Sequence, residues 1–359
     1  MQINLEIMQM KRFDYSFIKD SSFPARLLNT AGGIYSLKTM AEIRKTDFPN
    51  AFPELERIAV VQSVKSSNAI EGIITSDARI QAIVNKNSSP VNHDEQEIAG
   101  YRDALGLIHE RYKEIEFNER NILELHRILL SHTDDPLSGK YKERNNQIIE
   151  IDPQGNRSVR FSPVPADETR SAMQQLCLAY EDASSDSGLN QLILIPCVIL
   201  DFLCIHPFRD GNGRLSRLLT LLLLYREGFD VVKYISFEEQ INNYKQFYYD
   251  ALKRSSADWH ENANDYNPFI ENFLSMLYMC YKELDKRFNV VNSGKVNKSS
   301  RVESIVLGSL TPISKAEIHN ILPDVSITTI ENVLAGMLRK GQIKKTGSTR
   351  GARYIRNWE

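Results

Sequence analysis

Most of the chain repeats apolar residues every three to four positions, which is the spacing of an amphipathic α-helix. Ser76, Asn92 and Asn118 mark helix starts, because their short polar side chains accept hydrogen bonds from a first helical turn. Gly72 marks a helix end. The pattern predicts a mainly α protein. The predicted helices cover 53–71, 77–84, 93–114, 119–130, 167–182, 189–204, 213–227, 237–253 and 268–288.

One segment departs from the helical pattern. Residues 147–151 and 158–161 are short and rich in Ile, Val and Phe, and turn-forming residues separate them. We expect a β-hairpin that ends before Pro163 and Pro165. Two interpretations stay open, a purely structural flap and an edge strand that binds an extended segment of a target protein.

The pattern predicts that the C-terminal part is a separate small unit. Residues 291–300 are small and polar, which is typical of a linker. Helices are then predicted over 301–310, 314–322 and 326–340, and strands over 342–345 and 353–356. Three helices followed by a hairpin predict a winged helix-turn-helix domain.

Charge separates this unit from the rest. The 359 residues carry a net charge of −2, but residues 293–359 hold 11 Lys and Arg against 5 Asp and Glu. The remaining chain is therefore acidic, and no whole-chain basicity indicates nucleic acid. The basic unit fits either DNA phosphates or contact with a protein.

Cysteine spacing and apolar runs bound the class of protein further. The four cysteines form neither a CxxC pair nor a zinc-ligand pattern, so buried reduced thiols are expected. No apolar run approaches the ~20 residues of a membrane span. We expect a cytoplasmic protein with no membrane partner.

The densest group of functional side chains lies at 206–217, which reads HPFRDGNGRLSR. Gly211 and Gly213 let the main chain turn into a new helix, whose first amides and dipole favour an anion. Arg214 and Arg217 are three residues apart and share one helix face, and arginine binds phosphate oxygens in a bidentate manner. These features favour a polyphosphate ligand.

Two further side chains supply chemistry. Asp210 suits Mg²⁺, which bridges carboxylate and phosphate oxygens. His206 titrates near neutral pH and can accept a proton from an attacking hydroxyl. Together with the phosphate site they predict nucleotidyl or phosphoryl transfer, and the P-loop pattern is absent from the sequence.

This stretch resembles the signature of Fic-domain proteins, HPFx(D/E)GNGRxxR, at all nine specified positions. The resemblance implies a helical core with a β-hairpin flap and the transfer of AMP from Mg-ATP to a Ser, Thr or Tyr hydroxyl. It implies that His206 is the general base and that Asp210 holds Mg²⁺. It also implies phosphate contacts from Gly211, Asn212, Gly213, Arg214 and Arg217.

Residues 67–72, SNAIEG, resemble the inhibitory-helix motif (S/T)xxxE(G/N) of the same family. On that resemblance Glu71 pairs with Arg217 and keeps it from the nucleotide, with Ser67 as the first motif residue. Without the resemblance, Ser67 and Glu71 are simply polar residues one turn apart. Some relatives use this Glu to remove AMP, and the sequence does not decide whether Glu71 does so.

The resemblance also divides the chain. It implies an N-terminal segment with the inhibitory motif at 1–100 and a Fic core with following helices at 101–290, and the C-terminal pattern adds the linker at 291–300 and the winged helix-turn-helix at 301–359. The flap at 147–161 corresponds to the target-docking segment. Tyr248 and Tyr249 either line the adenine side or pack on a helix.

The resemblance and the C-terminal prediction also indicate partners and alternative functions. The expected partners are ATP, a target protein, and DNA or a protein that contacts residues 301–359. A homodimer and self-modification are also expected. One alternative keeps the scaffold but transfers UMP or phosphate. Another is a DNA-binding regulator that senses nucleotide through this domain.

Overall fold

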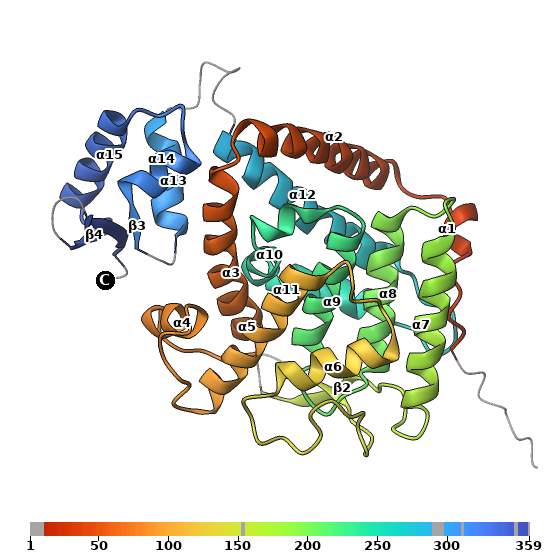
Figure 1. Ribbon diagram of the computed structural model, residues 1–359. Helices are drawn as coiled ribbons and strands as arrows, with labels where there is room; N and C mark the ends of the chain where they lie inside the picture. The colour runs from red at the N-terminus through yellow and green to blue at the C-terminus, as the bar shows by residue number, and fades with distance from the viewer. Residues whose placement is uncertain (1–10, 152–154, 289–297, 310–311, 348–350, 358–359) are drawn as a thin grey trace, which may run out of the picture.

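The computed structural model describes residues 11–151, 155–288, 298–309, 312–347 and 351–357. The chain is mainly helical, as predicted, with one long helical body and a smaller C-terminal unit beside it (Figure 1). The helices up to the hairpin are α1 (Phe17–Asp20), α2 (Ala25–Asp47), α3 (Ala51–Ile70), α4 (Asp77–Val84), α5 (His93–Arg111) and α6 (Glu119–Leu129). Those after the hairpin are α7 (Thr169–Ser185), α8 (Gln191–Ile205), α9 (Asn212–Arg226), the 3₁₀ helix η1 (Asp230–Lys233), α10 (Phe237–Asn243), α11 (Lys245–Ser255) and α12 (Asn267–Phe288).

Local sequence explains the helix starts. The side chains of Ser76, Asn92 and Asn118 accept hydrogen bonds from the first turns of α4, α5 and α6, which confirms all three as caps. Helix α8 is apolar around its whole circumference and lies buried in contact with α7, α9 and α12. Because α8 and α9 are both buried, the loop between them is held by a rigid core.

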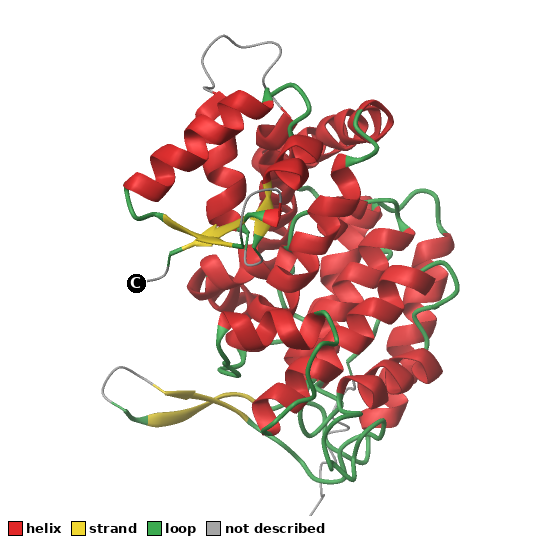
Figure 2. Ribbon diagram, turned by 60° about the vertical axis from the view of Figure 1, so that its left-hand side comes forward, coloured by secondary structure: helices red, strands yellow, loops and turns green. Residues whose placement is uncertain are grey.

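The predicted hairpin is present. Strand β1 (Ile148–Ile151) pairs antiparallel with β2 (Arg157–Phe161), and the pair projects from the helical body (Figure 2). An ion pair of 2.6 Å between Glu150 and Lys253 ties the hairpin to α11.

The C-terminal unit contains α13 (Lys298–Gly308), β3 (Ile313–Ser314), α14 (Lys315–Ile321), α15 (Ile327–Arg339), β4 (Ile343–Thr346) and β5 (Arg353–Arg356). Its strands form one sheet in the order β3-β5-β4. Helix α14 lies against α3, and the Gln62 amide of α3 donates to the Gly308 carbonyl at 2.7 Å. The unit thus contacts the helix whose last turn carries the predicted inhibitory motif.

Some predicted boundaries were wrong. The helix expected over 237–253 is two helices, because the backbone of Tyr244 leaves the helical conformation between α10 and α11. Helix α13 begins at Lys298, so 298–300 are helical rather than linker, while 291–297 lie outside the described residues. Helix α2 was not predicted, and its apolar residues are spread around it, with Leu28, Tyr35, Met40 and Ile43 exposed.

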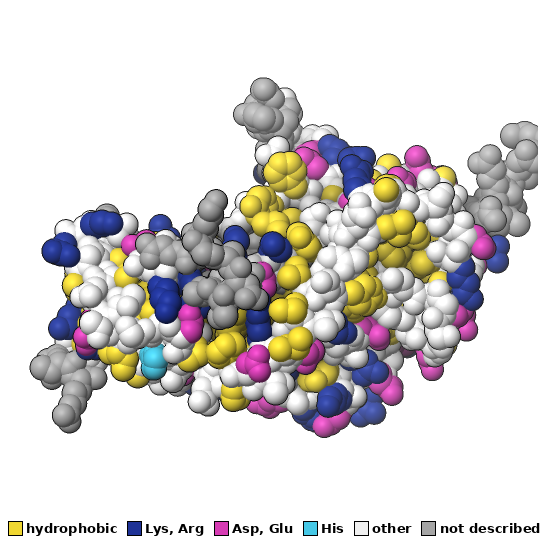
Figure 3. Space-filling model, turned by 90° about the horizontal axis from the view of Figure 1, so that it is seen from above, with side chains coloured by type: hydrophobic (Ala, Val, Ile, Leu, Met, Phe, Trp, Pro, Cys, Tyr) yellow, Lys and Arg dark blue, Asp and Glu magenta, His cyan; other side chains and the backbone are white. Residues whose placement is uncertain are grey.

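The upper face of the body, which α2 crosses in Figure 1, shows hydrophobic side chains among polar ones when seen from above (Figure 3). None of the described helices has both the length and the apolar character needed to cross a bilayer. The four cysteines are buried and free, as expected.

Candidate active site

The HPFRDGNGRLSR stretch forms the loop between α8 and α9 and the first turns of α9. His206 ends α8 in the left-handed conformation, at φ 50°. Gly211 begins α9 at φ 80°, which glycine adopts without strain. The loop is therefore set by two left-handed residues five positions apart, and buried helices hold its ends.

The His206 imidazole is kept neutral. Burial lowers its pKa to about 4, and the nearby ammonium of Lys142 acts in the same direction. A backbone hydrogen bond at Leu203 and the carboxylates of Glu71 and Asp210 act in the opposite direction. The buried Nδ1 of His206 has no hydrogen-bond partner among the described residues. The ring is therefore unprotonated at neutral pH.

Asp210 lies at the solvent side of the loop, with 59% of its side chain exposed. Its Oδ1 accepts from the Gly211 amide at 2.6 Å, and its Oδ2 lies 3.2 Å from Nη2 of Arg214. No group of three or more His, Cys, Asp or Glu side chains suited to a metal occurs in the described part of the chain. A single exposed carboxylate fits Mg²⁺ that takes its remaining ligands from phosphate and water.

Asn212 serves the loop itself. Its Oδ1 accepts from the Phe208 amide at 2.9 Å, and its Nδ2 donates to the Phe208 carbonyl at 2.8 Å. The side chain is buried, so a phosphate contact from Asn212, as the resemblance implies, falls to its backbone amide. That amide and the next ones belong to the first turn of α9, where N–H groups lack partners within the helix.

Arg217 is held by the last turn of α3 through its Nε and Nη2 groups. Its Nε donates to Ser67 Oγ at 2.8 Å, and Nη2 donates to the Ser67 carbonyl at 2.9 Å and to Glu71 Oε1 at 2.8 Å. The Glu71 carboxylate also covers Gly213, where an added Cβ would collide with it. Glu71 therefore occupies space at the start of α9, next to the amides that suit an anion.

Arg214 contacts a carboxylate that the sequence analysis did not single out. Its guanidinium forms an ion pair with Glu97 of α5, and both side chains are buried. Glu97 Oε1 is also 2.9 Å from Nε2 of the exposed His93. The spacing between Glu97 and the loop exceeds one hundred residues, so no local motif could have identified this pair.

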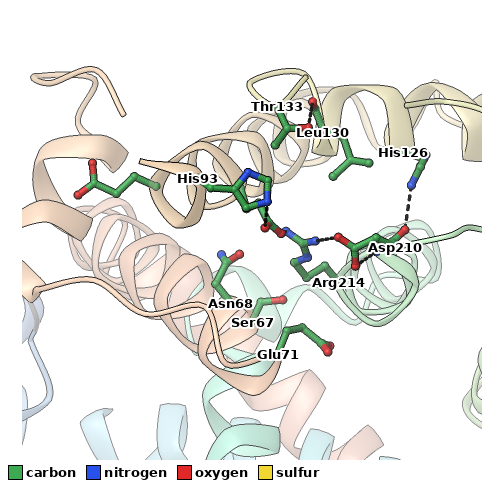
Figure 4. Close-up of polar contacts among 12 residues, drawn as sticks. Ser67, Asn68, Glu71, His93, His126, Leu130, Thr133, Asp210 and Arg214 are labelled. Atoms are coloured by element: carbon green, nitrogen blue, oxygen red, sulfur yellow. Dashed lines mark hydrogen bonds and ion pairs between the residues drawn. The ribbon is translucent and has the colours of Figure 1, made fainter. Parts of the chain in front are cut away.

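A second unpredicted residue, His126 of α6, fixes the loop from the other side. Its Nδ1 accepts from the Gly139 amide at 3.0 Å, so Nε2 carries the hydrogen and donates to the Asp210 carbonyl at 3.1 Å. The ring stacks on Phe208, with centroids 3.7 Å apart. Figure 4 shows Asp210 between His126 and Arg214. Burial lowers the pKa of His126 to about 4, which keeps this tautomer neutral.

Tyr248 and Tyr249 lie on α11, with ring centroids 5.5 Å apart. Tyr248 is buried and Tyr249 is partly buried. Burial raises the pKa of Tyr249, and the carboxylate of Glu71 adds to the effect, which places this ring near the Glu71–Arg217 pair. Arg160 of strand β2 lies 5.9 Å from the Tyr249 ring, so the hairpin reaches the same region.

Comparison with known proteins gives one family. Residues 116–224, which include the hairpin and the whole loop, match the sequence model of the Fic/DOC family. The protein adenylyltransferase Fic of Nematostella vectensis is 28% identical over 222 residues, or 59% of this chain and 45% of that protein. The same enzyme from Drosophila yakuba is 28% identical over 61% of this chain and 41% of its own length. The chain thus spans less than half the length of these relatives, and its residues 116–224 are similar to the Fic/DOC family.

Solved structures agree on the fold. A Fic family protein from Desulfovibrio desulfuricans aligns with a TM-score of 0.62 over 94% of this chain and 98% of its own, at 20% identity. A Fic domain containing signaling protein from Bacteroides thetaiotaomicron aligns with a TM-score of 0.55 over 72% of this chain and 95% of its own, at 22% identity. The predicted Fic-type helical core is confirmed.

Proposed function

We propose that this chain is an autoinhibited protein adenylyltransferase, which transfers AMP from Mg-ATP to a Ser, Thr or Tyr hydroxyl of a target protein or of itself. The relatives named protein adenylyltransferase Fic support the reaction class. The observation that carries the proposal is the arrangement at the start of α9. There a neutral histidine stands beside an anion-binding helix terminus, and Glu71 holds the nearby Arg217.

The chemistry assigned to the chain is one substitution at phosphorus. The target hydroxyl oxygen attacks the α-phosphorus of ATP and forms a new P–O bond. The bond between the α-phosphorus and the oxygen that bridges to the β-phosphorus breaks, and pyrophosphate leaves. His206, neutral at pH 7, takes the hydroxyl proton, a contribution typically of ~10²–10⁴ in rate. Asp210 would hold Mg²⁺, which neutralises phosphate charge when bound.

The first turn of α9 orients the phosphates in this scheme. Its free amides and helix dipole favour the anionic chain, and Gly213 lets an oxygen approach the backbone. Arg217 would reach the distal phosphate, where its planar guanidinium suits two oxygens. The hairpin would align the target's main chain by strand addition, because its edge is exposed and Arg160 brings it near Tyr249.

Autoinhibition follows from the contacts of Arg217. The hydrogen bonds to Ser67 and Glu71 occupy Nε and Nη2 of Arg217, so the guanidinium cannot present this edge to a phosphate. The Glu71 carboxylate also places negative charge over Gly213, where it repels a phosphate. Removing Glu71 should therefore free one Nη2 donor of Arg217 and the space over Gly213.

The test is label transfer from α-labelled ATP with Mg²⁺, to the chain and to a cell lysate. We expect strong labelling with Glu71→Gly, weak labelling with wild type, and none with Glu71→Gly combined with His206→Ala. Labelling that persists without His206 would contradict its role as base. A parallel reaction with γ-labelled ATP separates AMP transfer from phosphoryl transfer, because only phosphoryl transfer places the γ-label on the protein.

A further inference from the structure

The loop that carries His206 is held from behind by the segment 142–146, which follows α6. Lys142 is buried, although lysine is rarely buried without partners. All three protons of its ammonium have acceptors. Nζ donates to Asn146 Oδ1 at 2.9 Å, to the His206 carbonyl at 3.0 Å and to the Ile205 carbonyl at 3.2 Å.

The same segment contacts the next two carbonyls of the loop. The Lys142 amide donates to the Pro207 carbonyl at 2.9 Å. Asn146 Nδ2 donates to the Phe208 carbonyl at 3.3 Å. Four consecutive carbonyls, from 205 to 208, therefore have donors that come from Lys142 and Asn146.

These contacts explain the backbone of His206. A non-glycine residue at φ 50° is unfavourable and persists only where the surroundings hold it. Lys142 binds the carbonyls on both sides of the His206 amide unit, at the negative end of the α8 dipole. The positive charge, the three hydrogen bonds and the buried position all act on this one turn.

From this geometry we propose that Lys142, supported by Asn146, is a positioning residue that holds His206 in its left-handed conformation and so aims the imidazole at the target hydroxyl. The proposal rests on the proposed function for its kinetic consequence. Its structural consequence, the conformation of residue 206, can be measured without any reaction. Lys142 does not reach the phosphate site through any contact in the described part of the chain, so it should affect proton transfer and not nucleotide binding.

The kinetic test uses the full chain in the Glu71→Gly background. With Lys142→Met, which keeps the aliphatic stem but removes charge and donors, we expect kcat for AMP transfer to fall on the order of 10²-fold. KM for ATP should stay within about threefold, because uniform binding is untouched. Lys142→Arg, which keeps charge and donors, should restore most of kcat.

The matched control is Lys140→Met. Lys140 lies two residues away and is exposed, with one contact to the Pro136 carbonyl at 3.3 Å, so kcat should not change. An unchanged kcat in Lys142→Met, or a loss that Lys142→Arg does not restore, would overturn the proposal.

The structural test is a crystal structure of Lys142→Met with Glu71 intact. We expect the residue at 206 to leave the positive-φ region, and an unchanged backbone there would overturn the proposal even if no variant transfers AMP. If Lys142→Met does not fold, Asn146→Ala replaces it in both tests. It removes one partner of the ammonium and the donor to Phe208, and should lower kcat less but in the same direction, again with KM unchanged.

Discussion

Two arginines stand one turn apart on α9 and are both buried, yet their carboxylate partners differ in kind. Arg214 faces Glu97, which lies in the second turn of α5 and has 8% of its side chain exposed. Arg217 faces Glu71, which caps the C-terminal end of α3 and has 32% exposed. One pair is part of the core, and the other lies at its edge.

The position of each glutamate suggests what each pair does. Glu97 lies within α5, and both members of its ion pair with Arg214 are buried. Glu71 is followed by Gly72 at φ 84°, so the chain turns away from the site directly after it. Arg214 also reaches Asp210 and so helps to shape the loop, whereas Arg217 is held by Glu71 and Ser67. Under the proposed function, the Arg214 pair would serve the structure of the loop and the Arg217 pair would serve regulation.

The largest expected effect is on stability, from Glu97→Ala. Removing one member of a buried ion pair leaves an uncompensated charge and typically costs about 3–5 kcal/mol. We expect a loss in this range in the free energy of unfolding, measured by urea denaturation. Glu71→Ala is the control, and its loss should be smaller because Glu71 is partly exposed and Arg217 keeps both bonds to Ser67. Equal losses for the two variants would remove the distinction between the pairs.

The next prediction uses the carboxylate above Gly213. In wild type, Gly213→Ala places a methyl group against the end of the Glu71 side chain, which must shift and so weakens its ion pair with Arg217. In the Glu71→Gly background the collision is gone, and alanine in a helix is favoured over glycine by about 0.8–1.0 kcal/mol. The substitution should therefore be less favourable in wild type than in Glu71→Gly, which a double-mutant cycle of unfolding measures. An equal effect in both backgrounds would show that Glu71 does not cover this turn.

The smallest expected effect is a displaced pH profile. The pKa of His206 is lowered to about 4 from an ordinary 6.5, so the imidazole stays unprotonated over most of the acidic range. Transfer by Glu71→Gly should be constant from pH 8 to about 6 and fall only as the pH approaches 4. The Glu71 carboxylate raises the pKa of His206. Without it, the acidic limb of the pH–rate profile moves to still lower pH. A rate that halves near pH 6.5 would contradict a buried neutral base.

Linkage to folding has the same sign. The folded protein binds the His206 proton less readily than the unfolded chain does. Protonation of His206 therefore does not reduce the free energy of unfolding above about pH 6.5. The free energy of unfolding then decreases progressively as the pH falls from 6.5 toward 4. Wild type should become less stable over that range, and His206→Ala should show a weaker dependence.

Local patterns predicted the parts of the fold that depend on short stretches of sequence. The caps at Ser76, Asn92 and Asn118, the buried helix α8 and the hairpin all follow from residues within one or two turns of each other. The break at Tyr244 was missed because the flanking apolar spacing continues across it. Helix α2 was missed because its exposed face also carries hydrophobic side chains.

The site divides in the same way. His206, Asp210, Arg214 and Arg217 were identified because they fall in one motif. Glu97, His126 and Lys142 were not, because each acts from an element that folding alone brings to the loop. Asn212 was identified, but its side chain holds Phe208, a use that the sequence does not reveal.

The most direct measurement compares the initial rates of AMP transfer for wild type, Glu71→Gly, Glu97→Ala and the double variant, at a temperature where all four are folded. If Glu71 is the removable partner and Glu97 the structural one, Glu71→Gly should exceed wild type at least about tenfold, which corresponds to about 1.4 kcal/mol. Glu97→Ala should not exceed wild type, and the double variant should fall below Glu71→Gly. Activation by Glu97→Ala, or no activation by Glu71→Gly, would contradict the division of roles between the two arginines.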